Sequence, residues 1–147
     1  HGLIDSRKVT EFTKRILDEF LVKYDNSKQS VSELSGGNVQ KLIVGREFDY
    51  DPDLLIMNQP TRGIDVGAIE FIRKKIVDMR ARKKAILLVS ADLSEILSLS
   101  DTILVMHEGR IVGHISDVKN TSENDLGLYM LGVKEDSKEQ IGGAYCE

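Results

Sequence analysis

The sequence has little of what would place it in a specialised structural class. Among its 147 residues there are one cysteine, two prolines and no tryptophan, and only 5% are aromatic. A single cysteine, Cys146, can form neither an internal disulfide nor a zinc site. No apolar run approaches the roughly 20 residues that cross a bilayer, and no secretory hydrophobic region is recognised. We therefore expect one soluble α/β or α+β domain from a reducing compartment.

A strong excess of charge of one sign is also missing. Lysine and arginine number 20 against 24 acidic residues, which gives a net charge of −4 and no overall field for capturing nucleic acid. Residues 73–84 carry seven basic side chains and one acidic side chain, interleaved with apolar positions. This spacing favours the solvated face of a helix over a nucleic-acid or membrane contact, so no nucleic-acid partner is expected.

Hydrophobic periodicity divides the chain into alternating elements. It predicts helices over residues 8–24, after Gly37, over 66–82, after Asp92 and over 122–131. It predicts strands over 54–57, 85–89, 102–106 and 111–115, the last two forming a hairpin. This order predicts a parallel α/β core with an antiparallel flap, preceded by a helical piece.

Several side chains are assigned to the core on this pattern. The strands 54–57 and 85–89 lack alternation and are expected to be covered on both faces. The expected inward residues are Val9, Phe12, Ile16, Phe20, Leu21, Ile69, Ile72, Ile76 and the four methionines Met57, Met79, Met106 and Met130. His107 and His114 have no metal-ligand spacing and are interpreted as surface or hydrogen-bonded histidines, and no metal site is predicted.

The most informative segment is residues 34–41, Leu-Ser-Gly-Gly-Asn-Val-Gln-Lys, at the entrance to a helix. The first turn leaves backbone N–H groups without helical partners, and the helix dipole favours an anion there. Two glycines allow close approach, and Ser35 adds a hydroxyl donor. Taken alone, Ser-Gly-Gly is more often an ordinary loop-to-helix junction.

A second segment follows 21 residues after Gly37. The buried strand of residues 54–57 runs into Asn58 and Gln59, then into Pro60 and a Gly-Ile-Asp turn that ends at Asp65. Many nucleotidases end such a strand in carboxylates that hold Mg²⁺ and position water. Here the two positions are amides.

Together these segments resemble the C-terminal half of an ATP-binding cassette (ABC) ATPase. Residues 34–38 resemble the signature loop, 54–59 the Walker B strand, 62–65 the D-loop and 89–93 the H-loop. The strings LSGGNVQK and PTRGIDVGA are similar to the carbohydrate-uptake branch, and Gln59 with GAIEFI is most similar to the second cassette of nucleoside or simple-sugar importers. The implied fold class is a partial P-loop NTPase: a parallel sheet, a C-terminal β-hairpin and part of the helical signature subdomain.

The sequence also departs from the family. The Walker A loop is absent, so the chain is expected to be a fragment that begins inside the helical subdomain. Asn58 and Gln59 occupy the positions of the family's magnesium aspartate and catalytic glutamate, and Ala91 occupies that of the switch histidine. Amides supply no carboxylate and alanine no donor, so this site is expected to hydrolyse ATP hardly at all.

The resemblance nevertheless implies a role for the signature loop in trans. In ABC dimers each ATP lies between Walker residues of one cassette and the signature loop of the other. Ser35, Gly36, Gly37 and Asn38 would contact nucleotide held by the first cassette of the same chain, while Gly63 and Asp65 form the D-loop. The resemblance implies ATP and Mg²⁺ in the full assembly, none bound tightly by the fragment, and transmembrane permease partners at the cytoplasmic face of the membrane.

The domain division expected from these motifs has three parts. Residues 1–50 would end the helical subdomain, 51–118 would belong to the ATPase core, and 119–147 would form a helix and a flexible tail. A sheet that lacks its Walker A strand would expose an edge, which invites self-association. Two other functions stay open: a non-transport ABC ATPase of chromosome maintenance or translation, and an α/β interaction module without a nucleotide role.

Overall fold

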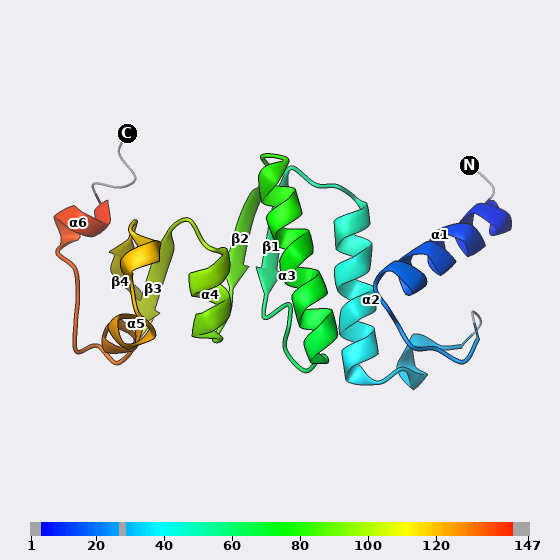
Figure 1. Cartoon of the computed structure of the whole chain (residues 1–147), viewed down its shortest axis with the longest axis horizontal. Coiled ribbons are helices and arrows are strands. Elements are labelled where there is room, and N and C mark those ends of the chain that lie inside the picture. The colour runs from blue at the N-terminus through cyan, green and yellow to red at the C-terminus, as the bar shows by residue number, and fades with distance from the viewer. Residues whose placement is uncertain (1–3, 27–28, 143–147) are drawn as a thin grey trace. The chain divides into compact units, whose positions relative to one another are not determined.

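The computed structural model describes residues 4–26 and 29–142, so Cys146 lies outside the described residues. The chain divides into two compact units, residues 1–89 and 90–147, which are treated separately below. The expected order of elements is confirmed: two helices, a parallel strand–helix–strand unit, a short helix and an antiparallel hairpin followed by a helix. Figure 1 shows these elements in chain order from blue to red.

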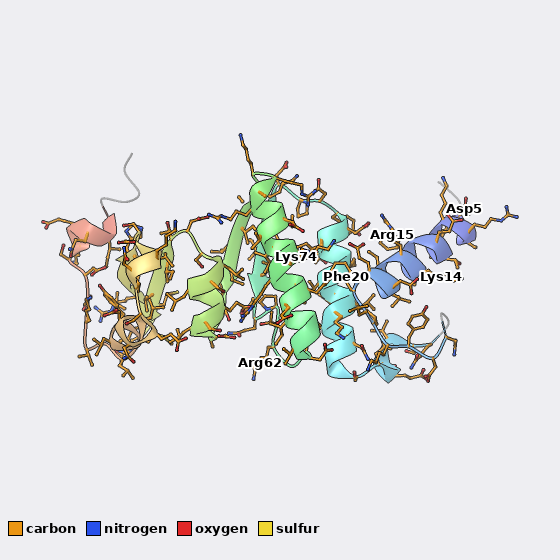
Figure 2. The ribbon with its side chains drawn as sticks, in the orientation of Figure 1. Asp5, Lys14, Arg15, Phe20, Arg62 and Lys74 are labelled. Atoms are coloured by element: carbon orange, nitrogen blue, oxygen red, sulfur yellow. The ribbon has the colours of Figure 1, made fainter. Side chains whose placement is uncertain are left out.

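The first unit begins with two α-helices, α1 (Ser6–Glu19) and α2 (Gly36–Asp49), joined through a 3₁₀ turn, η1 (Val31–Glu33). The carboxylate of Asp5 caps α1 by accepting hydrogen bonds from the N–H groups of Arg7 and Lys8. The helix ends before residue 24 because Leu21 has a left-handed backbone (φ 52°), which a right-handed helix cannot contain. The ring of Phe20 meets Phe71 edge-on at 5.3 Å and Phe48 at 6.2 Å. Phe20 therefore joins α1 to the rest of the unit (Figure 2).

The remainder of this unit is a strand–helix–strand unit of β1 (Leu54–Asn58), α3 (Val66–Ala81) and β2 (Ala85–Val89). The two strands pair in parallel, from Leu54 opposite Ala85 to Asn58 opposite Val89. One face of β1 is buried through Leu55 and Met57. The buried side of α3 is formed by Ala68, Ile72, Ile76 and Met79.

The second unit contains α4 (Leu93–Leu99), β3 (Ile103–His107), β4 (Arg110–Ile115), a 3₁₀ turn η2 (Val118–Asn120), α5 (Glu123–Met130) and α6 (Lys138–Gly142). The hairpin β3–β4 and α5 enclose a core of Ile103, Val105, Val112, Val118, Leu126 and Tyr129. The segment after α5 then returns to β4. Asp136 donates its N–H to the carbonyl of Val112, and its carboxylate accepts from the N–H of His114 and the hydroxyl of Tyr129. The short α6 was not expected from the sequence.

Three expectations about the core were wrong. Val9 and Phe12 are exposed, because α1 meets α2 only near its C-terminal end (Figure 1), and Leu21, which lies beyond the helix, is exposed as well. Met106 and Met130 are 63% and 44% exposed, Met106 because its side chain alternates outward on β3. Within the first unit, the strands of the parallel pair are covered on one face only, by α3. The open face consists of Leu54, Ile56, Leu87 and Val89, all between 48% and 64% exposed.

The basic run and the histidines have ordinary structural contacts. Arg82 forms an ion pair with Asp51, and Lys84 forms ion pairs with Asp51 and Asp53. Lys75 pairs with Glu19 on α1. The Nδ1 atom of His107 lies 2.9 Å from the carbonyl oxygen of Met130. Three of the basic residues in the run 73–84 therefore form ion pairs with acidic residues of this chain.

Candidate functional site

The Leu-Ser-Gly-Gly-Asn segment, residues 34–38, forms the loop before α2 and its first turn. Ser35 is the N-cap of α2, with extended backbone (φ −64°, ψ 153°), and its hydroxyl oxygen accepts from the N–H of Asn38 at 3.4 Å and from its Nδ2 at 3.1 Å. The side-chain Oδ1 of Asn38 in turn accepts from the backbone N–H of Lys23 at 2.9 Å. The Ser35 oxygen therefore acts as an acceptor toward the helix, and its O–H remains able to donate.

The two glycines of this loop have different surroundings. A Cβ atom built on Gly36 would meet no atom within 4 Å, whereas one on Gly37 would lie 2.9 Å from the carbonyl oxygen of Gly63. Both residues stand in the first turn of α2, where the N–H groups have no carbonyl of the same helix to bond. Gly37 is thus required by a close approach inside the unit, and Gly36 faces open space.

The second group of predicted residues lies at the C-terminal end of β1. Asn58 is exposed and is the last residue of the strand. Gln59 is half-buried, has a left-handed backbone (φ 53°), and donates its N–H to the carbonyl of Val89 at 2.8 Å. The chain then turns through Pro60 and Thr61, both buried, to the exposed Arg62, which Figure 2 shows pointing away from the ribbon.

This turn ends at Asp65, the N-cap of α3. Its Oδ1 accepts from the N–H of Ala68 at 3.0 Å, and its Oδ2 lies 2.6 Å from Nζ of Lys41 on α2. The hydrogen bond from Lys41, followed by that from Ala68, lowers the pKa of the Asp65 carboxyl below its ordinary value. Asp65 is therefore held ionised at the junction of the turn and the helix.

The structure brings two predicted groups together within the first unit. The side-chain amide of Gln40 donates to the carbonyl of Pro60 at 3.2 Å and reaches that of Gln59 at 3.5 Å, so α2 contacts the turn between β1 and α3 directly. Gln40 and Lys41 belong to the motif of residues 34–41, but the sequence pattern predicts no role for them. The only signal for them was their spacing of three and four residues from Gly37, which places all three on one face of a helix. Ala91 is exposed, belongs to the second unit and precedes Asp92, the N-cap of α4.

The two parts of this region, the loop before α2 and the end of β1, differ in what they can bind. The loop at Ser35–Gly37 combines free first-turn N–H groups, a hydroxyl and open space over Gly36, which suits phosphate oxygens. The end of β1 offers amide groups at Asn58 and Gln59 in place of carboxylates, a donor set that does not suit Mg²⁺ well. Across residues 4–26 and 29–142 there is no grouping of three or more histidine, cysteine, aspartate or glutamate side chains able to hold a metal ion.

None of the described helices combines the length and the apolar character that a bilayer span requires.

Comparison with known sequences gives a consistent set of relatives. The chain is 46% identical over 132 residues to the nucleoside import ATP-binding protein NupA of Lactococcus lactis subsp. cremoris, covering 90% of this chain and 26% of that protein. It is 42% identical over 142 residues to the guanosine import ATP-binding protein NupO of Bacillus subtilis, covering 97% of this chain and 28% of that protein. The chain thus spans about a quarter of the length of these curated relatives. No protein-family model matches it.

Comparison with solved structures gives the fold. An ATP-binding subunit of an ABC transporter superposes with a TM-score of 0.71 at 20% identity, over 87% of this chain and 56% of that one. A dimeric ATP-binding cassette bound to ADP and Pi gives a TM-score of 0.66 at 17% identity, over 78% and 50% of the two chains. The architecture of this chain is that of part of an ABC cassette, as the sequence predicted.

Proposed function

From its homology to the ATP-binding proteins of nucleoside and sugar ABC importers and from its ABC-cassette fold, we propose that this chain is part of such an ATP-binding subunit. Its contribution is the loop Ser35–Gly37, which closes over ATP held by a partner cassette. The observation that carries this proposal is the N-terminal end of α2, where the first-turn N–H groups and the open space over Gly36 suit phosphate oxygens.

The chain's own nucleotide site is proposed to be inactive. The last residue of β1 and the residue after it are the amides Asn58 and Gln59, and the residue that follows Ser90 is alanine. An amide can orient water but cannot take up a proton from it, and Ala91 offers no donor to a phosphate oxygen. In the assembly, ATP with Mg²⁺ would supply the phosphoanhydride bond whose hydrolysis drives transport. The residues that catalyse this hydrolysis belong to the partner cassette.

The proposed assembly follows from the family. This chain corresponds to the second cassette, it associates with the first cassette of the same subunit and with transmembrane permease subunits, and it lies at the cytoplasmic face of the membrane. The imported solute is proposed to be a nucleoside or a simple sugar, because the matched relatives carry those names. Those names favour import over the chromosome-maintenance or translation alternative.

The test uses the complete ATP-binding subunit. Ser35→Ala removes the hydroxyl and is expected to lower the steady-state rate of ATP hydrolysis at least about tenfold, because a hydrogen bond to a charged group is worth roughly 1.5–3 kcal/mol. The matched control is Lys74→Met, an exposed residue of α3, which should leave the rate unchanged. Unchanged hydrolysis in the Ser35 variant would support the remaining alternative, an interaction module without a nucleotide role.

A second experiment tests the isolated chain. Calorimetric titration of the 147 residues with Mg-ATP should show no binding in the micromolar range, because the Walker A loop is not in this sequence. Micromolar binding would contradict the assignment of the loop to a site completed by another cassette.

A further inference from the structure

One face of α2 packs against the turn between β1 and α3, residues 59–65, and is bonded to it. Gly37 lies against the carbonyl of Gly63, Gln40 donates to the carbonyl of Pro60, and Lys41 binds Asp65. These three positions are spaced i, i+3 and i+4, so they form a single stripe along the helix. The stripe begins two residues after Ser35, on the same helix whose first turn presents the proposed phosphate-binding loop.

Lys41 differs from the other members of the stripe because it is a buried charge. The residue is 5% exposed, while lysine is among the residues least often found in this state without a partner. Its Nζ lies 2.6 Å from Oδ2 of Asp65 and 3.3 Å from the carbonyl oxygen of Leu21, the residue with left-handed backbone after α1. One ammonium group thus joins α2, the start of α3 and the end of α1.

We propose that Lys41 is a positioning residue: by binding Asp65 and Leu21 it fixes α2, and with it the loop Ser35–Gly37, against the turn 59–65. The turn that follows the amides Asn58 and Gln59 then serves as the support of the loop that acts on the partner's ATP. This inference rests on the proposed function in trans.

The energetics of the pair give the proposal a distinctive signature. Asp65 can be solvated without Lys41, since its side chain is 63% exposed, and it keeps its hydrogen bond to Ala68. Lys41 without Asp65 is a buried ammonium that has lost its carboxylate. Replacing a whole buried ion pair by apolar side chains is often neutral for stability, whereas removing one partner is costly when it leaves the other charge buried and unpaired. Loss of Lys41 leaves only the exposed carboxylate of Asp65, and loss of the Asp65 charge leaves the buried ammonium. Lys41→Met should therefore fold normally and lose only the positioning, while Asp65→Asn should also lose stability.

The experiment measures ATP hydrolysis by the complete subunit and thermal unfolding of each variant. Lys41→Met is expected to lower kcat about tenfold with KM for ATP changed less than about threefold, because the loop engages nucleotide only after the partner has bound it. Lys41→Arg retains a cation that reaches Asp65 and should recover most of kcat. Lys74→Met, on the exposed side of α3, should change neither parameter.

The link itself is tested by a double-mutant cycle. If the two residues act as one link, kcat of Lys41→Met/Asp65→Asn should equal that of Lys41→Met alone within about twofold, instead of showing two multiplied losses. Unchanged kcat in Lys41→Met would overturn the inference, as would a loss of kcat proportional to the loss of folded protein. Ser35→Ala in parallel separates the cases: a slow Ser35 variant beside a normal Lys41 variant overturns only the positioning role, and two normal variants overturn the proposed function as well.

Discussion

The neighbouring glycines Gly36 and Gly37 permit a test in which the same added methyl group has two different effects. At Gly36 a Cβ atom would enter open space, and at Gly37 it would lie 2.9 Å from the carbonyl oxygen of Gly63. A separation this short has to be relieved by moving backbone on α2 or on the turn before α3. The two substitutions therefore separate the needs of the fold from those of a ligand.

The expected stability changes follow from those surroundings. Gly36→Ala should leave the free energy of unfolding unchanged or raise it by up to about 1 kcal/mol, because alanine restricts the unfolded chain and fits a helix better. Gly37→Ala should lower it by about 1–3 kcal/mol, the usual cost of overpacking. Urea unfolding of the 147-residue chain, followed by far-ultraviolet circular dichroism, measures both.

The expected activities run differently. In the complete subunit Gly36→Ala should reduce the rate of ATP hydrolysis at least about tenfold although it folds as well as the wild type, because the methyl group occupies the space proposed for phosphate. A normal rate in Gly36→Ala would refute the reasoning that this open space receives nucleotide. A large loss of stability in the same variant would refute the geometry on which the comparison depends.

Three further predictions concern the fold and its association. Phe20→Ala removes a ring that is 3% exposed and contacts Phe48 and Phe71, so urea unfolding should show a loss of about 3–5 kcal/mol, against little change for the exposed Tyr50→Ala. Hydrogen bonds from the hydroxyl and then the N–H of Ser122 lower the pKa of Asp125 below 3.8, so this cap of α5 stabilises the helix above pH 3.8 and is lost as the pH falls through the lower, folded-state pKa. Amide exchange at the start of α5 should accelerate on acidification, and Asp125→Asn should abolish that dependence. The isolated chain should self-associate through the open edge and face of β1 and β2 at micromolar concentration, and sedimentation should show Ile56→Lys reducing this association while Val77→Lys on α3 does not.

The sequence predicted the order of elements well because the local signals agree with the tertiary structure. Asp65 was expected as the N-cap of α3, and its carboxylate does accept from the N–H of Ala68. The parallel pairing of β1 with β2 and the hairpin of β3 with β4 followed from connection length and turn residues. In these cases a few neighbouring residues determine the conformation.

The errors arose where burial depends on distant parts of the chain. Ile56 has the apolar neighbours of a fully buried strand but is 64% exposed, because within the described residues of the first unit only one layer of helix covers the strand pair. Lys41 was invisible as a structural residue because a lysine in a helix is usually solvated, and only the fold shows Asp65 and Leu21 around it. The roles of Ser35 to Asn38 came from family resemblance and stay predictions.

The return of the chain to β4 has a consequence for any truncation or fusion at the C-terminal side. Asp136 occupies the outer edge of the hairpin, taking the N–H of His114 with its side chain and giving its own N–H to the carbonyl of Val112. One residue thereby substitutes for a third strand and blocks β4 as a template for another chain. A version that stops at Gly132 would keep every strand and helix of the hairpin core, yet would expose both backbone groups. A shortened version of the second unit should therefore retain residues 133–137, so that Asp136 still covers the edge of β4.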